Sequence, residues 1–230
     1  DKGNILVIGD SGVGKSTLIN AVLGEEKAET SFGNAGTTKE LKVYENDILE
    51  FRVIDTVGFE PGFFKRLEAI NSVKKWSKKA IKEGKENSNI NVIWFCVEGT
   101  SSKLFPETIK SLSKATAIYP SVPIIVVITK SYSKPEREKN IQMINNAFAK
   151  QKSSKNLKGI IPVVASIFEI DEEQYVAQEG ITELIDMTYN LIPEGMQAAK
   201  NDVELFKLNR KRSFAHTAIT AFTVSAIGIG

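Results

Sequence analysis

Four continuous apolar runs recur along the chain, and each has the length of a strand that is buried on both faces. They cover residues 5–8, 92–97, 124–129 and 160–165. Apolar residues at helical spacing lie between the later runs, at Phe105, Ile109 and Leu112, then at Ile141, Ile144 and Phe148. Strands that alternate with helices are typical of βαβ units. The sequence therefore predicts a largely parallel sheet covered by helices.

A second pattern predicts an antiparallel pair within this sheet. Two short segments alternate between apolar and polar residues, with apolar positions at Leu41, Val43, Leu49, Phe51 and Val53. A period of two is typical of half-exposed strands. Asn46 and Asp47 lie between the segments and favour the tight turn of a hairpin. We therefore expect the second and third strands to pair antiparallel, which makes the sheet mixed.

The last part of the chain predicts further helices. A helix after the sixth strand is indicated by Ile181, Leu184, Ile185 and Thr188. Pro193 is expected to end or restart this helix, because proline lacks the backbone N–H that the helix needs. Residues 194–212 are interpreted as an additional polar helix that leads to an apolar tail over 213–230. We therefore divide the chain into a domain over 1–192 and a C-terminal helical extension over 193–230.

Composition and charge exclude several kinds of site. Hydrophobic residues make up 42% of the chain and the formal charge is +2, so no overall attraction to nucleic acid or membrane is predicted. Cys96 is the only cysteine, which excludes an internal disulfide and favours a reduced, cytoplasmic setting. His216 is the only histidine and lies in the tail, so histidine general-base catalysis in the core is excluded. No pattern for a zinc site, a nucleophile triad or a glycosidase carboxylate pair is present.

The strongest motif follows the first strand directly. Residues 9–16 read GDSGVGKS and match the phosphate-loop pattern GxxxxGK[ST] at every position. Glycines let backbone N–H groups face the phosphates, and the following helix, expected over 15–23, presents its N-terminus to them. Lys15 is expected to contact the β- and γ-phosphates, and Ser16 to bind Mg²⁺. The predicted binding residues of this loop are Asp10, Ser11, Gly12, Val13, Gly14, Lys15, Ser16 and Thr17.

Two shorter motifs follow in the order that a nucleotide-sensing switch requires. Asp55 begins a DTVG sequence, in which its carboxylate would hold Mg²⁺ through water and the N–H of Gly58 would meet the γ-phosphate. Gly36, Thr37 and Thr38 lie in the polar segment before the second strand, where a threonine would complete the Mg²⁺ shell. Each motif is common by itself, but their order and spacing reinforce the phosphate loop.

These motifs resemble those of the translation-factor-related GTPases, specifically the Era/TrmE-like group. The resemblance covers roughly residues 4–192 and rests on the phosphate loop, 36–38, 55–58, Thr129-Lys130 and Ala165-Ser166. It implies an α/β fold of the Ras-like P-loop G domain type, with a six-stranded mixed sheet between helices and an extra C-terminal helix. It also implies that Lys130 lies along the base and that the N–H groups of 165–166 contact the guanine oxygen.

The same resemblance implies a role for each motif residue. The implied catalytic residues are Lys15, Thr38 and Gly58. The implied metal ligands are Ser16, Thr38 and Asp55. The implied base-binding residues are Thr129, Lys130, Ala165 and Ser166. Residues 93–97 also resemble the fourth strand of a subgroup that carries a small-residue-rich helical domain, and the tail from Phe214 fits the start of such a domain, truncated here.

Three positions depart from the family pattern. Tyr132 stands where the family has an aspartate that accepts two hydrogen bonds from guanine, so guanine preference has weaker support than phosphate binding. Whether Tyr132 stacks on the base or faces away stays open. Phe59 stands where many switch GTPases have a glutamine that orients water, so slow hydrolysis is expected. Gly12 replaces an asparagine of some Era-like members, so no potassium dependence is predicted.

Two charged segments leave their role open. Residues 65–82 contain seven lysines or arginines, one acid and an apolar stripe at helical spacing. A helix that packs on the sheet is favoured there over a surface for an acidic partner, RNA or lipid head groups. For 213–230, a packing helix is favoured over a membrane-associating segment that follows Arg210, Lys211 and Arg212.

The sequence as a whole predicts a cytoplasmic switch that binds GTP or GDP with Mg²⁺ and slowly hydrolyses GTP to GDP and phosphate. Two alternatives stay open: a base-indifferent or ATP-preferring P-loop NTPase, suggested by Tyr132, and a nucleotide-bound scaffold without significant hydrolysis, suggested by Phe59. Expected partners are guanine nucleotide and an effector or activating protein near the switches. RNA association, a nucleotide-dependent dimer and peripheral membrane attachment through the C-terminal segment are further hypotheses.

Overall fold

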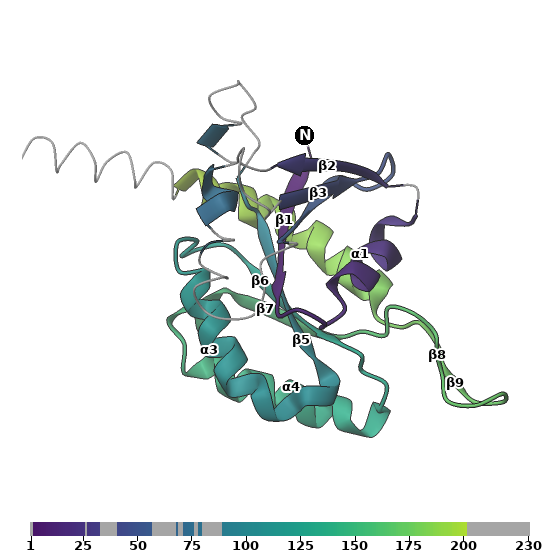
Figure 1. Ribbon diagram of the computed structural model, residues 1–230. Helices are drawn as coiled ribbons and strands as arrows, with labels where there is room; N and C mark the ends of the chain where they lie inside the picture. The colour runs from purple at the N-terminus through teal and green to yellow at the C-terminus, as the bar shows by residue number, and fades with distance from the viewer. Residues whose placement is uncertain are drawn as a thin grey trace, which may run out of the picture.

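A seven-stranded sheet lies between two helical layers in the computed structural model (Figure 1). The structure describes residues 2–25, 27–32, 41–56, 68, 71–75, 78–79 and 89–201. The strands are β1 Gly3–Gly9, β2 Ala28–Phe32, β3 Leu41–Glu45, β4 Phe51–Asp55, β5 Val92–Glu98, β6 Ile124–Thr129 and β7 Leu157–Pro162. Their order is β2-β3-β4-β1-β5-β6-β7, and β3 is antiparallel to both of its neighbours while the other pairs are parallel. The predicted mixed α/β sheet is confirmed.

The sheet carries one strand more than the six that were predicted. The additional strand, β2, pairs antiparallel with β3 at the edge of the sheet. Its sequence, AETSF, contains one large apolar residue. An antiparallel edge strand can face water, so its sequence does not need a continuous apolar run. Hydropathy therefore gave no signal for it.

The predicted turn at Asn46 and Asp47 is present between β3 and β4. The Asn46 side-chain oxygen accepts hydrogen bonds from the backbone N–H groups of Ile48, at 3.1 Å, and Leu49, at 2.8 Å. Its amide donates to the carbonyl of Leu23 at 2.9 Å. An asparagine side chain commonly closes turns in this way. The hairpin is thereby fastened to the end of the first helix.

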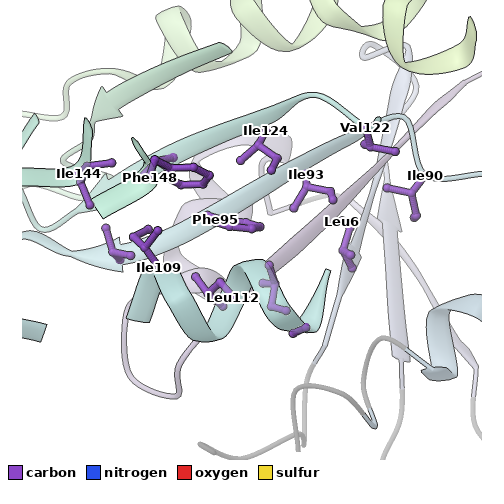
Figure 2. Close-up of a cluster of buried hydrophobic side chains, with 14 of the residues drawn as sticks. Leu6, Ile90, Ile93, Phe95, Ile109, Leu112, Val122, Ile124, Ile144 and Phe148 are labelled. Carbon is purple, nitrogen blue, oxygen red and sulfur yellow. The ribbon is translucent and has the colours of Figure 1, made fainter. Parts of the chain in front are cut away.

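Helices cover both faces of the sheet. They are α1 Lys15–Leu23, α3 Phe105–Ala115 with the preceding 3-10 helix η1 Gly99–Leu104, α4 Lys134–Ala149 followed by the 3-10 helix η2 Lys152–Asn156, and a helix over 181–201. Figure 1 shows α3 and α4 on one face and α1 with the light-green helix over 181–201 on the other. Figure 2 shows this packing on one face of the sheet. The helices contribute Ile109 and Leu112 from α3 and Ile144 and Phe148 from α4, and the sheet contributes Leu6, Ile93 and Phe95. The helical stripes read from the sequence are thus the buried faces.

The helix over 181–201 continues through Pro193, so the prediction that Pro193 ends or restarts it was wrong. An interior proline costs a helix about 3 kcal/mol. Packing against the sheet offsets this cost, because Ile192 and Ala198 are buried and the backbone of Gly195 lies against the carbonyl of Asn91. The separate helix predicted from 194 is the second half of this helix as far as residue 201, and 202–212 lie outside the described residues. The domain boundary at 192 stays a prediction.

The sixth predicted strand is displaced along the chain. Residues 160–165 were expected, whereas β7 runs from Leu157 to Pro162. Its ladder with β6 ends at the pair of Pro162 with Ile128, and the N–H of Val163 still donates to the carbonyl of Ile128 at 2.8 Å. Val163 and Val164 remain buried after the strand has ended. Buried loop residues therefore made the apolar run appear longer at its end than the strand.

Parts of the basic segment over 65–82 are described, and these parts are helical. Residues 68, 71–75 and 78–79 are in helix, and Val73 is fully buried among the side chains of the α3 and α4 face. Lys74 and Lys75 are exposed. This agrees with a helix that packs an apolar stripe on the sheet. Among the described residues, no helix is both long and apolar enough to cross a membrane.

Candidate functional site

Four of the predicted motif segments lie at one edge of the sheet. Because β1, β4, β5, β6 and β7 are parallel, their carboxyl ends meet at this edge. The phosphate loop follows β1, Asp55 ends β4 and Thr129 ends β6. Ala165 and Ser166 follow shortly after β7. The carboxyl edge of an open parallel sheet is the usual place for a ligand in such folds.

The phosphate loop has the backbone that its glycines predict. Gly12 has a φ of 81° and Gly14 a φ of 92°, both in the left-handed region that favours glycine. Gly14 is the N-cap residue of α1, so the free N–H groups of the helix open toward the loop. Lys15 begins α1, is half-buried, and its Nζ donates to the carbonyl of Gly9 at 2.7 Å. The arrangement is that of a preformed anion cradle.

The remaining loop residues divide into anchors and exposed groups. Val13 is buried and packs into the core on the α1 face. Asp10 is half-buried, and its carbonyl accepts from the N–H of Val13 at 3.4 Å. The exposed or half-exposed residues are Ser11, Gly12, Ser16 and Thr17. The hydroxyl-bearing side chains that were predicted to meet ligand are therefore accessible from solvent.

Thr129 joins the phosphate loop to the sheet. Its side chain is 2% exposed, and its hydroxyl lies 2.5 Å from the carbonyl of Val13 and 3.2 Å from the carbonyl of Val97. A hydroxyl has one proton to donate, so it serves the two acceptors as a shared donor. The end of β6 thereby fixes the position of the loop after β1.

Lys130 extends this connection with its side chain. Its backbone is left-handed, with a φ of 53°, which is uncommon for a residue with a Cβ atom. Its Nζ donates to the carbonyl of Gly12 at 2.9 Å and to Glu98 Oε1 at 2.7 Å. The hydrogen bond from Lys130 lowers the pKa of Glu98, and burial partly opposes this. The stem of Lys130 is thus held across the phosphate loop.

Asp55 offers a carboxylate oxygen that suits a cation. Its side chain is 1% exposed, and Oδ1 has no hydrogen-bond partner among the described residues. Burial raises the pKa of Asp55, and the charge of Lys15 acts in the opposite direction. Magnesium prefers oxygen ligands such as carboxylate and hydroxyl groups. The orphaned oxygen and the accessible Ser16 hydroxyl fit Mg²⁺, whereas the third predicted ligand, Thr38, lies outside the described residues, as do Thr37, Gly58 and Phe59.

An aromatic pair joins the loop after β6 to the segment after β7, on the predicted base side of the site. Tyr132 stacks on Phe168, with ring centroids 4.1 Å apart and planes inclined by 18°. Phe168 belongs to a short hairpin of β8 Phe168–Glu169 and β9 Tyr175–Val176. Ser166 precedes this hairpin and is exposed, while Ala165 is half-buried. The structure therefore places the Tyr132 ring against a protein ring.

A second set of contacts holds the two base-side loops together. Arg137 of α4 donates to the carbonyl of Ser131 at 2.8 and 2.9 Å and forms an ion pair with Glu179 at 2.5 Å. Glu179 in turn exchanges backbone hydrogen bonds of 3.0 Å with Val164. The hydrogen bond from Arg137 lowers the pKa of Glu179. The loop after β6 and the loop after β7 are consequently braced as one unit.

Comparison with known proteins decides the family. Residues 4–130 match the family described as 50S ribosome-binding GTPase, which is more than half of the chain. The protein belongs to this GTPase family. The predicted P-loop GTPase G domain is thereby confirmed, and GTP binding and hydrolysis are the activities of the family.

Curated relatives share part of their length with this GTPase domain. The probable GTP-binding protein EngB of Desulfovibrio desulfuricans is 25% identical over 165 residues, which is 72% of this chain and 75% of that protein. Cell division control protein 10 of Saccharomyces cerevisiae is 25% identical over 226 residues, 88% of this chain and 65% of that protein. The tRNA modification GTPase MnmE of Cytophaga hutchinsonii is 32% identical over 127 residues, 54% of this chain and 25% of that protein.

Solved structures support the fold. A GDP-bound mutant of NFeoB from S. thermophilus has a TM-score of 0.53 at 12% identity, and the similarity covers 85% of this chain and 63% of that one. A variant of the protein SsGBP has a TM-score of 0.51 at 14% identity, with 85% and 57% covered. Membership of the Era/TrmE-like subgroup and a following small-residue-rich domain stay predictions.

The structure adds residues to the GTPase site that sequence reasoning missed. Glu98 holds the Lys130 ammonium group, Phe168 holds the Tyr132 ring, and Arg137 braces the base-side loops. Glu98 did leave a signal, because a single acid directly after the buried run of β5 must lie at the carboxyl edge of the sheet. Phe168 and Arg137 left none, since Phe168 meets Tyr132 of another loop and Arg137 meets Glu179, which is 42 positions away.

Proposed function

We propose that the protein binds GTP together with Mg²⁺, slowly hydrolyses it to GDP and phosphate, and acts as a molecular switch. The observation that carries this proposal is the phosphate loop, with left-handed Gly12 and Gly14 at the N-terminus of α1 and with Lys15 at its mouth. In the reaction a water oxygen attacks the γ-phosphorus and the bond from that phosphorus to the β–γ bridging oxygen breaks. Charge on the phosphoryl oxygens is what the protein must stabilise.

The residues of the chain divide this work by their position. Backbone N–H groups of the phosphate loop would hold the α- and β-phosphates, and Lys15 would exchange its hydrogen bond to Gly9 for the β- and γ-phosphates. Ser16, Thr38 and, through water, Asp55 would hold Mg²⁺, which neutralises phosphate charge when bound. The unpartnered Asp55 Oδ1 supports its part in this set.

The switch and the slow rate rest on residues of the predicted switch segments. Thr38 and the N–H of Gly58 would sense the γ-phosphate, and loss of that phosphate would release both. Phe59 cannot orient an attacking water molecule, so a partner or a second copy would have to supply that group. An effector or activating protein near the switches is therefore part of the proposal, as is a nucleotide-dependent dimer.

A titration with fluorescent GTP and Mg²⁺, competed by GTP, GDP, ATP and ADP, tests this function. The wild-type protein is expected to bind, and Lys15→Ala is expected to lose nearly all triphosphate affinity. Lys103→Ala, which removes an exposed lysine outside the site, is the matched control and should bind normally. Equal affinity of Lys15→Ala and wild type would contradict the site. Single-turnover phosphate release then separates a slow GTPase from a scaffold that does not hydrolyse.

A second candidate function, a base-indifferent P-loop NTPase, is favoured by the Tyr132–Phe168 stack. A ring that faces another ring does not offer guanine the two acceptor oxygens of an aspartate. If ATP competes as well as GTP, this candidate replaces guanine specificity. Tyr132→Asp should then raise the preference for GTP over ATP, while Tyr132→Phe, which keeps the stack, should leave it unchanged.

We propose a cytoplasmic protein whose segment over 213–230 either packs on a following helical domain or attaches peripherally to a membrane. The G domain would end near residue 192. Co-sedimentation of the full chain with anionic vesicles, compared with a chain ending at residue 201, distinguishes the two roles of the tail.

A further inference from the structure

A second concave site lies at the opposite end of the sheet from the phosphate loop. It is a cavity of about 630 Å³ between the end of α3, the end of α4, η2 and the loop that enters β6. This volume is within the range of about 300–1,000 Å³ that small-molecule pockets usually have. Ile124, the first residue of β6, lines the cavity, whereas Thr129, the last, lies at the phosphate loop. At about 3.3 Å per residue, the strand separates the two sites by roughly 17 Å.

The cavity carries a concentrated positive charge. Four lysines line it, Lys114, Lys150, Lys152 and Lys155, and no acidic residue is among the described residues that form its walls. None of the four makes an ion pair within the part of the chain that the structure describes. Such a concave, single-sign surface attracts anions.

Helix capping accounts for only part of this charge. Lys114 lies in the last turn of α3, Lys150 is the C-cap residue of α4, and Lys155 lies in the last turn of η2. Cations are favourable at helix C-termini, where the partial charge is about half a unit negative. Capping explains why individual lysines are tolerated there. It does not explain why four of them surround one cavity.

The floor of the cavity combines hydroxyl groups with apolar surface. The Oγ atoms of Ser113 and Ser153 lie 3.0 Å apart and join the two walls. The hydroxyl of Tyr119 is buried without a hydrogen-bond partner among the described residues. Buried polar groups usually have a partner, so an orphaned hydroxyl beside a cavity indicates a position where one can bind. Ala117 and Pro120 are exposed and supply apolar surface to the wall, with Ile124 buried behind them.

We propose that this cavity is a second ligand site that binds a small phosphorylated molecule with an apolar body, independently of the nucleotide. The lysines would hold the phosphate oxygens at the rim. The apolar body would lie on Ala117 and Pro120, and the serine hydroxyls would complete the contacts. Soluble phosphate esters and phospholipid head groups share this chemistry, and the experiment below distinguishes them.

Backbone-amide NMR titration of the full chain with phenyl phosphate tests the site, in the presence of saturating GDP and Mg²⁺. The amides of Ile124 and Gln151 are expected to shift, while those of the phosphate loop remain unchanged. Because GDP itself should shift the phosphate-loop amides, failure of the proposed function is visible in the same spectra and is distinguishable from failure of this proposal.

Matched variants separate a built site from diffuse charge. The triple change K114Q/K152Q/K155Q should weaken phenyl phosphate binding at least about tenfold, since several charge-assisted hydrogen bonds are lost. The control K103Q/K110Q/K139Q removes three exposed lysines elsewhere and should bind as wild type does. Thermal melts check that both variants fold, and Lys→Arg changes at the three cavity positions should restore binding.

Vesicles that contain phosphatidate identify the source of the ligand. If the site takes lipid head groups, wild type co-sediments with these vesicles and the cavity variant does not. If it takes soluble esters, phenyl phosphate binds and the vesicles do not. The proposal is overturned if neither probe binds at millimolar concentration, or if the cavity and control variants lose affinity equally.

Discussion

Replacing Thr129 by valine tests whether the end of β6 positions the phosphate loop. The side chain is 2% exposed, and its hydroxyl is shared between the carbonyls of Val13 and Val97. Valine has nearly the same shape but no donor, so a buried acceptor loses its partner at a cost of about 1–3 kcal/mol. For a chain of this size the midpoint of thermal unfolding should fall by roughly 2–4 °C per kcal/mol, that is by about 2–12 °C. Because Val13 belongs to the phosphate loop, GDP affinity should fall as well.

Two other variants make the result specific. Thr129→Ser keeps the hydroxyl and should retain most of the nucleotide affinity. Thr116→Val removes an equally buried hydroxyl, which donates to the carbonyl of Leu112. That carbonyl also accepts from the N–H of Thr116 at 3.0 Å, so it keeps a partner in the variant. The loss of stability should therefore be smaller than for Thr129→Val, and GDP affinity should be unchanged. Differential scanning fluorimetry with and without GDP measures both effects. A Thr129→Val protein with wild-type stability and GDP affinity would refute the role of this contact.

Three further predictions concern residues near the site and the sheet. Lys130 lowers the pKa of Glu98, so the stabilisation by this carboxylate is present above its unfolded pKa and is lost as pH falls through its folded pKa. In urea titrations Glu98→Gln should therefore be less stable than wild type at neutral pH and equal to it at strongly acid pH; a difference that is constant with pH would contradict this. Gly195→Ala would place a Cβ atom 1.8 Å from the carbonyl oxygen of Asn91. It should therefore lower the free energy of unfolding by about 1–3 kcal/mol in the same titrations. A neutral effect would mean that the helix is not docked there. Cys96 is fully buried and its pKa is raised to about 12, so iodoacetamide should label it only after denaturation, and rapid labelling of the native protein would disprove the burial.

Much of the sheet could be predicted because buried strands leave a local signal. The run 124–129 gave both ends of β6, since polar or turn residues bound it on either side. The run 160–165 predicted the existence of β7 and misplaced its ends, because Val163 and Val164 stay buried beyond the last residue of the strand, Pro162. Strand β2 left no hydropathy pattern. Burial and backbone pairing are different properties, and the sequence reports the first more directly.

In the site, too, local features could be predicted from the sequence and contacts between distant segments could not. The phosphate loop is a local motif, in which the chemistry of binding dictates residue types at fixed spacing, so it could be read in full. Glu98 and Lys130 are 32 positions apart and meet only because β5 and β6 are neighbours in the sheet. The stack of Tyr132 on Phe168 joins the loop after β6 to strand β8 in the same way. Contacts made by topology require the fold before they can be named.

The unbroken helix over 181–201 has a mechanical consequence. It begins directly after Gly180, next to the braced base-side loops, and reaches Gly3 through Ile192 and Asn91 through Gly195 at the other end of the sheet. At 1.5 Å per residue this is a rod about 30 Å long. Because Ile192 and Gly195 are docked against Gly3 and Asn91, the far half of this rod is fixed to the sheet. The helix therefore ties the loop that carries Glu179 rigidly to the opposite edge of the sheet, so the two edges are mechanically connected through one continuous element.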